Sequence, residues 1–374
     1  MKTNPFSYGA AVKGENFYDR KKDCKRIVDT LAGGNNMALY APRRFGKTSL
    51  VFKAIEQLER QGFICVYFDF MPVFSPESFI RFYAKSLATK QSNLQKFAKT
   101  FVSIVKNVRP VLSFGKDGTP EFGVDFAGTA VDETTISQLL DLPEQMAKND
   151  KRALMFFDEF QDVEKLKDIH FEELLRSKIQ QQHQRVNYLF FGSKTHIMQA
   201  MFNDKKRAFY NAASQMTIGY LPEKDTMTFL QQNFSKKGIR LDESMVRYII
   251  AATANVPHYI QLLAAEIWQS TESNTDITRE IVDESILQVL TLKNDYHMEM
   301  FDRQSKSKKL LLLALCAGGK NIFSEAYRRA NNLPNAATLQ RAVSGLTNDG
   351  VIDRMDSEYF ISDPFFKLFL KDLS

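Results

Sequence analysis

Five short apolar runs constrain the fold of this chain more than any other feature. They occupy residues 37–41, 63–68, 153–157, 186–191 and 215–220. Each is 5 or 6 residues long, rich in aromatic and branched side chains, and without the polar alternation of a half-exposed strand. Such runs are typical of strands buried on both faces of a parallel sheet, and the amphipathic stretches between them are typical of crossover helices. The sequence therefore predicts an α/β domain with a doubly wound, five-stranded parallel sheet.

The segments outside these runs predict further elements. Residues 19–31 carry apolar side chains at helical spacing and indicate a leading helix, and residues 108–133 read as an inserted hairpin. Helical patterns follow from 222 to about 296, and then three short helices, expected to begin at 308, 321 and 335, precede a hairpin. That last order is typical of a winged helix. We therefore expect three domains: a core at 1–221, an all-helical lid at 222–300 and a winged helix at 301–374.

Composition agrees with a folded, multidomain protein. The chain has 374 residues, of which 44% are hydrophobic and 25% charged, and a formal net charge of +6. That charge permits nucleic-acid binding without implying it. Three dispersed cysteines match no disulfide framework. The longest apolar run, 310–317, is too short to span a bilayer and the N-terminus lacks a secretory signal, so we expect a cytoplasmic protein with no membrane partner.

A phosphate-binding loop follows the first apolar run. Residues 41–49, Ala-Pro-Arg-Arg-Phe-Gly-Lys-Thr-Ser, fit G-x-x-x-x-G-K-[ST] except that Ala41 replaces the first glycine. Backbone N–H groups at the start of the next helix would surround a β-phosphate, and Gly46 would allow close approach. Lys47 would bridge the β- and γ-phosphates, and the Thr48 hydroxyl would enter a Mg²⁺ shell.

Polar side chains follow two later strands. Asp158 and Glu159 end the third apolar run, where Asp158 could hold Mg²⁺ and Glu159 could orient an attacking water. The alternative for such a pair is a solvated helix start. Ser193, after the fourth run, could sense the γ-phosphate or cap the following helix. Asp69, after the second run, is expected to cap a turn rather than reach the water or metal.

Several motifs in this order resemble one family. Asp19-Arg20, the loop residues Pro42, Arg43, Arg44, Phe45, Gly46, Lys47, Thr48 and Ser49, and the runs at 157–161, 191–194 and 255–259 are similar to the prokaryotic AAA-type ATPases of the archaeal ATPase family, in the STAND branch of signalling NTPases. The resemblance implies a P-loop core, a helical lid and a winged helix, with ATP or ADP and Mg²⁺ bound. It also implies that Asp19 and Arg20 lie near the adenine and that Pro257 and His258 close the lid over the nucleotide.

The chain departs from the family pattern in three places. Ala41 replaces a glycine of the loop, and Asn255 replaces the glycine of the lid's Gly-x-Pro. Tyr210 is followed by Asn-Ala-Ala rather than by an arginine that could stabilise transition-state charge. Three other arginines could supply that charge, each with an alternative reading: Arg207 as an exposed helix end, and Arg43 and Arg44 as partners of the chain's own acids.

The sequence of the winged helix is compatible with more than one role. Its third helix would point Thr338, Gln340, Arg341 and Ser344 outward, and one arginine is little for a recognition helix. A packing or autoinhibitory role is the alternative to DNA binding, although Arg328 and Arg329 could contact a DNA backbone.

Two functional hypotheses follow from these patterns. The first is a Mg²⁺-dependent ATPase that couples nucleotide state to movement of the lid and winged helix, with Lys47, Glu159 and Ser193 catalytic. The alternative is a slowly hydrolysing nucleotide switch or DNA-binding regulator. A small-molecule kinase is a distant third, because no acceptor signature is present. A protein partner and a homo-oligomer are both compatible with the sequence.

Overall fold

The computed structural model describes residues 3–9, 20–106, 108–126, 131–147, 151–355 and 357–373. Two compact units divide the chain. The sheet unit comprises residues 21–41 and 50–218, and the helical unit comprises the described residues of 1–20, 42–49 and 219–374. The phosphate-binding loop, Pro42–Ser49, is therefore grouped with the helical unit although it follows the first strand in the chain.

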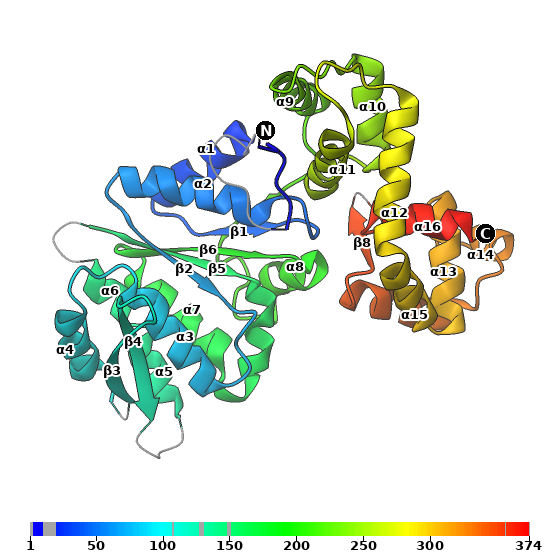
Figure 1. Cartoon of the computed structure of the whole chain (residues 1–374). Helices are drawn as coiled ribbons and strands as arrows, with labels where there is room; N and C mark the ends of the chain where they lie inside the picture. The colour runs from blue at the N-terminus through cyan, green and yellow to red at the C-terminus, as the bar shows by residue number, and fades with distance from the viewer. Residues whose placement is uncertain are drawn as a thin grey trace. The chain divides into compact units, whose positions relative to one another are not determined.

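The sheet unit contains the predicted five-stranded sheet (Figure 1). All adjacent strand pairs are parallel, in the order β2-β5-β6-β1-β7. The strands are β1 (Met37–Tyr40), β2 (Ile64–Asp69), β5 (Ala153–Asp158), β6 (Val186–Gly192) and β7 (Ser214–Thr217). The apolar runs thus predicted all five strands to within one residue at each end, except that the last run extends to residue 220 and β7 ends at Thr217. Because the strands are parallel, Asp158 and the residues after Gly192 lie at one edge of the sheet.

Alternate residues of these strands pack on opposite faces. Ala153, Met155 and Phe157 of β5 belong to one large cluster with Tyr188 and Phe190 of β6. Aromatic and aliphatic side chains from α3 (Pro76–Ala88), η2 (Phe160–Ile169), α7 (Phe171–Gln182) and α8 (Thr195–Asn203) complete this cluster. Helices α1 (Lys21–Ala32) and α2 (Lys47–Arg60) lie on the opposite side of the sheet from α3 and α7 (Figure 1). The burial of both faces explains why the strands lack polar alternation.

The remaining elements of this unit include the inserted hairpin. Strands β3 (Val108–Phe114) and β4 (Pro120–Phe126) pair antiparallel, around a turn in which Gly118 has a φ of +76°. The hairpin therefore occupies much of the predicted 108–133 segment, of which residues 127–130 lie outside the described residues. The other helices are α4 (Leu94–Ile104), α5 (Glu133–Leu139) and α6 (Leu142–Met146).

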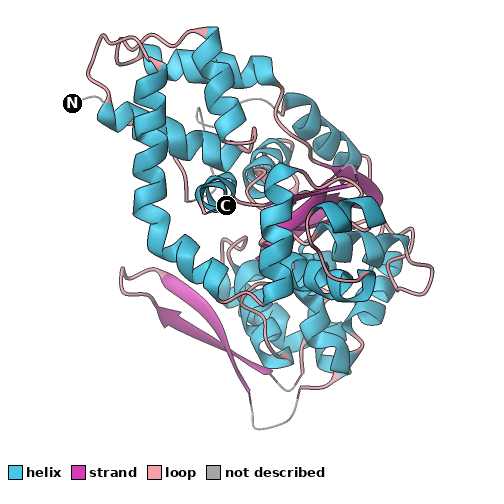
Figure 2. Cartoon of the chain, turned by 90° about the vertical axis from the view of Figure 1, so that its right-hand side faces the viewer, coloured by secondary structure: helices cyan, strands magenta, loops and turns pink. Residues whose placement is uncertain are grey.

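The helical unit contains mainly helices, and helices dominate the described chain as a whole (Figure 2). The first four are α9 (Glu223–Ser235), α10 (Glu243–Ala252), α11 (Pro257–Ser270) and α12 (Arg279–Asp302). The winged helix follows with α13 (Lys306–Ala317), α14 (Glu325–Ala330), α15 (Ala336–Asn348), β8 (Ile352–Met355), β9 (Glu358–Ile361) and α16 (Pro364–Asp372). Within the described residues, none of the helices combines the length and apolar character needed to cross a membrane.

Two details of the winged helix differ from expectation. Helix α14 begins at Glu325, capped by Ser324, and not at Asn321, because Asn321 has a φ of +52° that no helix can include. Helix α16, whose N-cap is Asp363 and whose first residue is Pro364, is an element that the sequence pattern did not predict. Its Phe366, Phe369 and Leu370 are buried in the winged-helix core with Leu339, Val343 and Leu346 of α15.

Candidate active site

The phosphate-binding loop ends at the first turn of α2. Gly46 has a φ of +81°, and a Cβ placed on it would meet no atom within 4 Å. Open space therefore lies beside the N-terminus of a 14-residue helix, where the first N–H groups have no intrahelical acceptor. This geometry fits a bound phosphate. Ala41 is not among the described residues with positive φ, so the missing loop glycine imposes no strain there.

Lys47 is directed back into the loop. Its side chain is buried, and Nζ donates a hydrogen bond to the Pro42 carbonyl oxygen at 3.1 Å. The ammonium group therefore lies within the same loop whose backbone could hold a phosphate. Of the two hydroxyl residues that follow Lys47, Thr48 is half-buried and Ser49 is buried.

The arginines of the loop contact other parts of the helical unit. Arg44, with a φ of +70°, stacks its guanidinium 4.9 Å from the centre of the Tyr259 ring and hydrogen-bonds the Tyr259 hydroxyl. Its Nη1 also lies 3.3 Å from Asp363 Oδ2, so Arg44 does pair with an acid of the chain. Arg43 lies against Gly350, where a Cβ would come within 2.6 Å of Arg43 Nη1.

Several basic side chains surround the carboxylate of Asp363. Besides Arg44, its Oδ2 lies 3.6 Å from Lys293 Nζ and 3.8 Å from Nε2 of the fully buried His297. Its Oδ1 accepts hydrogen bonds from the backbone N–H groups of Phe365 and Phe366 and thereby caps α16. The same aspartate thus joins the phosphate-binding loop, α12 and the winged helix inside the helical unit.

A second acid of the winged helix lies near the loop charges. Burial raises the pKa of Asp353, on β8, to about 6, while the positive charges of Lys47 and Arg43 act in the opposite direction. Gly350, which precedes β8, lies against Arg43, so this end of β8 approaches the loop within the helical unit.

Asp158 ends β5 in the sheet unit as a buried carboxylate. Its Oδ2 accepts a hydrogen bond of 2.7 Å from the Tyr67 hydroxyl. Burial raises the pKa of Asp158 to about 6, the Tyr67 bond lowers it, and the negative charge of Glu159 raises it further. A buried acid with raised pKa at a strand end is typical of a functional site rather than of a solvated helix start.

Glu159 and Ser193 meet at the same edge of the sheet. Ser193 Oγ donates to Glu159 Oε2 at 2.8 Å, and the Ser193 backbone N–H points to the same oxygen at 3.4 Å. Gln161 Nε2 donates to it as well. The N-cap of α8 is Lys194, without a side-chain cap bond, so the Ser193 hydroxyl is used for Glu159 and not for helix capping.

Two other polar candidates have structural partners. Asp69 Oδ1 accepts a hydrogen bond of 2.8 Å from the Met71 backbone N–H, which confirms the expected turn cap. Arg207 forms ion pairs with Glu172 and Glu164 and is only partly exposed, so it is neither a free finger nor a solvated helix end in this structure.

The family resemblance implied that Asp19, Arg20, Pro257 and His258 lie near the nucleotide. Asp19 lies outside the described residues. Arg20 is buried, and Nη2 donates to the carbonyl oxygens of Gly219 at 2.8 Å and Phe45 at 3.3 Å. Pro257 is the first residue of α11, and burial together with nearby Arg44 and Lys293 lowers the pKa of His258 to about 4.

Asn255 performs the backbone role of the glycine that it replaces. Its φ is +54°, a conformation that asparagine adopts more readily than most residues. Its side-chain Nδ2 donates to the Leu221 carbonyl oxygen at 2.9 Å. The turn before α11 is therefore formed without glycine.

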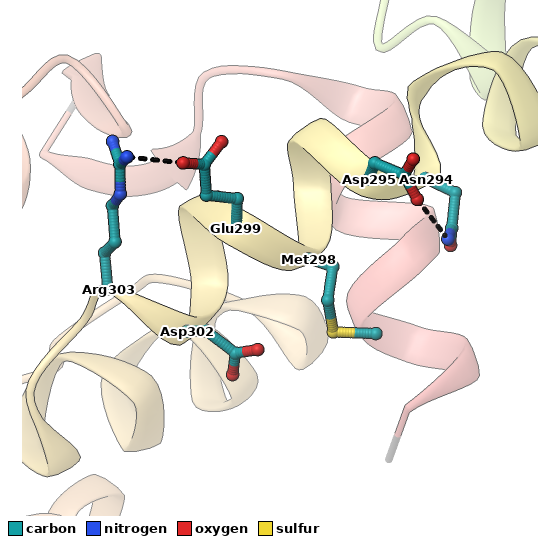
Figure 3. Close-up of a pocket in the computed structure, with 6 residues that line it drawn as sticks. All are labelled: Asn294, Asp295, Met298, Glu299, Asp302 and Arg303. Carbon is teal, nitrogen blue, oxygen red and sulfur yellow. Dashed lines mark hydrogen bonds and ion pairs between the residues drawn. The ribbon is translucent and has the colours of Figure 1, made fainter.

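No predicted nucleotide-binding residue lines the depression on α12. That depression is open and is formed by one face of the helix, with a Glu299–Arg303 ion pair and an Asn294–Asp295 hydrogen bond among its residues (Figure 3). Among the described residues, no group of three His, Cys, Asp or Glu side chains could hold a metal ion. Mg²⁺ at phosphoryl-transfer sites commonly uses one or two protein groups together with phosphate oxygens.

Four residues of these arrangements were not predicted from the sequence: Tyr67, Gln161, Tyr259 and Asp363. Gln161 and Tyr259 lie in the runs 157–161 and 255–259, but nothing local indicates which atoms they contact. Asp363 directly precedes Pro364, and an aspartate before proline is a helix-start signal that could have revealed both it and α16.

Comparisons with known proteins agree with the fold and its domains. Residues 17–263 match the model of an ATPase domain predominantly from Archaea, and residues 295–372 match a probable winged helix domain. The structure is similar to the Walker-type ATPase PABY2304 of Pyrococcus abyssi, with a TM-score of 0.67 and 16% identity over 98% of this chain and 99% of that chain. It is also similar to the ORC1 protein of Aeropyrum pernix, solved in complex with DNA, with a TM-score of 0.51 and 14% identity over 95% and 93%. None of the curated proteins matches the chain.

The fold and its motifs define a class of protein. A five-stranded parallel sheet, a phosphate-binding loop leading into α2 and a C-terminal winged helix are the features of a P-loop ATPase with a winged-helix domain. The chain belongs to the family of ATPase domains found predominantly in Archaea, whose model covers more than half of its 374 residues.

Proposed function

We propose that this protein is a Mg²⁺-dependent ATPase that converts ATP and water to ADP and phosphate. The observation that carries the proposal is the open, positive-φ Gly46 at the N-terminus of α2, inside a G-K-T-S sequence directly after β1. Backbone groups of the loop would hold the phosphates, with Lys47 as their counter-charge. Arg20, Pro257 and His258 would belong to the nucleotide-binding set, as the family implies.

The hydrolytic part of the proposal depends on Glu159. Chain connectivity joins the loop to β1, which lies in the same parallel sheet as β5 and β6. Thr48 and Asp158 would hold Mg²⁺, which neutralises phosphate charge when bound. Glu159 would accept a proton from the attacking water, and Ser193 would sense the γ-phosphate.

Two substitutions test the hydrolytic proposal directly. We expect Lys47→Ala to lose nucleotide binding, and Glu159→Gln to bind nucleotide while turnover falls at least about 100-fold. Lys53→Ala and Glu56→Gln are matched controls, because these residues form a surface ion pair further along α2. Equal, slow hydrolysis by wild type and Glu159→Gln, with both binding nucleotide, would contradict the ATPase function.

We further propose that nucleotide state is coupled to a lid at 222–300 and a winged helix at 301–374, following a core at 1–221. The contacts of Arg44 with Tyr259 and Asp363, and of Arg43 with Gly350, support this coupling. Any movement of the loop on binding phosphate would have to change those contacts. Hydrogen exchange of residues 352–372 in Glu159→Gln, compared between ADP and ATP with Mg²⁺, should differ; identical exchange would contradict the coupling.

The same contacts favour a second candidate, a slowly hydrolysing switch of the STAND type. Both loop arginines are engaged by the winged helix, which would stabilise one nucleotide state for long periods. Native mass spectrometry of the purified protein distinguishes the candidates. A monomer that retains ADP supports the switch, whereas an ATP-dependent homo-oligomer without retained ADP supports a turnover enzyme.

DNA binding through the winged helix is compatible with both the turnover ATPase and the slowly hydrolysing switch. Gln340, Arg341 and Ser344 are exposed on α15 and Thr338 is half-buried, while Arg329 is paired with Glu325. The likeness to ORC1, which was solved with DNA, supports testing it. Duplex affinity should fall with salt and fall further in Arg341→Ala; salt-independent or unchanged binding would exclude α15 as the contact.

A further inference from the structure

Gln161 is a buried polar residue with one unpaired side-chain oxygen. It lies between Phe160 and Asp162 in η2, it is only 3% exposed, and a polar side chain buried to this extent normally has full hydrogen bonding. Its Nε2 donates to Glu159 Oε2, whereas its Oε1 has no hydrogen-bond partner among the described residues. The side chain is therefore buried at the cost of one unpaired oxygen in order to reach the carboxylate.

The hydrogen bonds to Glu159 converge on one of its two oxygens. Oε2 accepts from Gln161 Nε2, from Ser193 Oγ at 2.8 Å and from the Ser193 N–H at 3.4 Å. Oε1 accepts no hydrogen bond from any residue in the described part of the chain. Donors on one side fix the orientation of a carboxylate and leave the opposite oxygen as its open acceptor.

Gly192, at the end of β6, lies against the amide of Gln161. A Cβ on Gly192 would lie 2.0 Å from Gln161 Oε1, which is a steric overlap. Gly192 is not among the described glycines with positive φ, so its backbone conformation does not require glycine. The amide of Gln161 instead occupies the space that a side chain at the end of β6 would need.

We propose that Gln161 is a positioning residue for ATP hydrolysis, which holds Glu159 Oε2 jointly with Ser193 so that Oε1 takes the proton of the attacking water. The inference rests on the proposed ATPase function. In the step itself, the water oxygen bonds to the γ-phosphorus, its proton moves to Glu159 Oε1, and the bond to the bridging oxygen breaks with its electron pair leaving on ADP. Gln161 forms no bond to the reacting atoms.

Gln161→Met tests the proposal because it keeps the length of the side chain and removes the donor. We expect kcat to fall about 10- to 100-fold, as for loss of a hydrogen bond to a charged group. KM, and the dissociation constant of a fluorescent ATP analogue, should remain within about twofold. Gln161→Glu, which turns an oxygen toward the carboxylate, should lose more activity than Gln161→Met.

Gln182→Met is the matched control. Gln182 is equally buried in the same unit, and its Nε2 donates to the Leu140 carbonyl oxygen and to Asp141 Oδ1, both at 3.1 Å. Its loss should lower thermal stability but leave kcat per folded molecule unchanged. Gly192→Ala should reproduce the kcat loss of Gln161→Met, because the added methyl group displaces the amide.

Non-additivity decides whether Gln161 acts through Glu159. In the Glu159→Gln background, Gln161→Met should cause no further loss of turnover. A further tenfold loss there, or an unchanged kcat in Gln161→Met alone while Glu159→Gln is inactive, would overturn this inference and leave the ATPase function standing. Equal turnover by wild type and Glu159→Gln would contradict both.

Discussion

Replacing Asp363 tests how firmly the winged helix is held to the phosphate-binding loop. Asp363 has two separable roles: Oδ1 caps α16, and Oδ2 faces Arg44, Lys293 and His297. Asn at this position retains an oxygen that can cap the helix and removes the negative charge. Ala removes both. The pair of variants therefore separates the charge from the cap.

The structure sets the expected magnitudes. A hydrogen bond to a charged group contributes about 1.5–3 kcal/mol. Among the described basic side chains, Arg44 alone donates a hydrogen bond to Oδ2 with a distance of 3.3 Å, and its side chain is 41% exposed, so solvent weakens the interaction. We expect Asp363→Asn to lower the free energy of unfolding by about 1–2 kcal/mol. Asp363→Ala should lower it by about 1 kcal/mol more through loss of the cap.

The pH dependence of this effect has a defined sign. Burial opposes ionisation of Asp363, but His297, Lys293 and Arg44 outweigh it and hold the pKa well below its usual range. A depressed folded-state pKa contributes stability that is fully present above the unfolded pKa, about 3.9, and is lost as pH falls below it. The difference between wild type and Asp363→Asn should therefore shrink below about pH 4.

Urea unfolding followed by the fluorescence of Trp268 measures these changes, because the single tryptophan lies on α11 in the same unit as Asp363. Asp276→Asn is the control: Asp276 pairs with Arg240, but the two side chains are 61% and 80% exposed. Its loss should change stability much less than Asp363→Asn does, because solvent screens the exposed pair. If Asp363→Asn is as stable as wild type or as Asp276→Asn at pH 7, the interactions of Asp363 with Arg44, Lys293 and His297 do not hold the winged helix to the loop.

Three further predictions concern other sites. Tyr67→Phe removes the 2.7 Å hydrogen bond to Asp158 and should lower kcat about tenfold and raise the Mg²⁺ concentration needed for half-maximal turnover; an unchanged Mg²⁺ titration would disprove a role for Tyr67. Arg207→Ala should lower the free energy of unfolding by about 1–3 kcal/mol through loss of the ion pair with Glu172, while turnover per folded molecule is unchanged; a large loss of kcat would instead indicate that Arg207 is a catalytic arginine. Burial raises the pKa of Cys65 to about 12, so iodoacetamide at pH 8 should label half-buried Cys316 before Cys65, which peptide mass spectrometry would show; early labelling of Cys65 would contradict its burial.

The elements that the sequence predicted well are those with a local cause. The five strands follow from short apolar runs, and the helical winged-helix segments follow from their spacing. The discrepancies are equally local in origin: α14 begins later because of the left-handed Asn321, and β7 ends at Thr217, before Gly219.

The residues of the candidate site also fall into those that the local sequence predicts and those that only the fold brings together. The amino-acid sequence by itself determined the class of protein, because the glycine, lysine and hydroxyl of a phosphate-binding loop and the two acids after a buried strand are each set by neighbouring residues. Only the tertiary structure decided which atoms meet: Gln161 with Glu159 over Gly192, Tyr67 with Asp158, and Arg44 with Asp363, which is 319 residues away. Hydrogen bonds and steric exclusion act over a few ångströms, so these partnerships exist only once packing has brought the strand ends, and separately the loop and the winged helix, together.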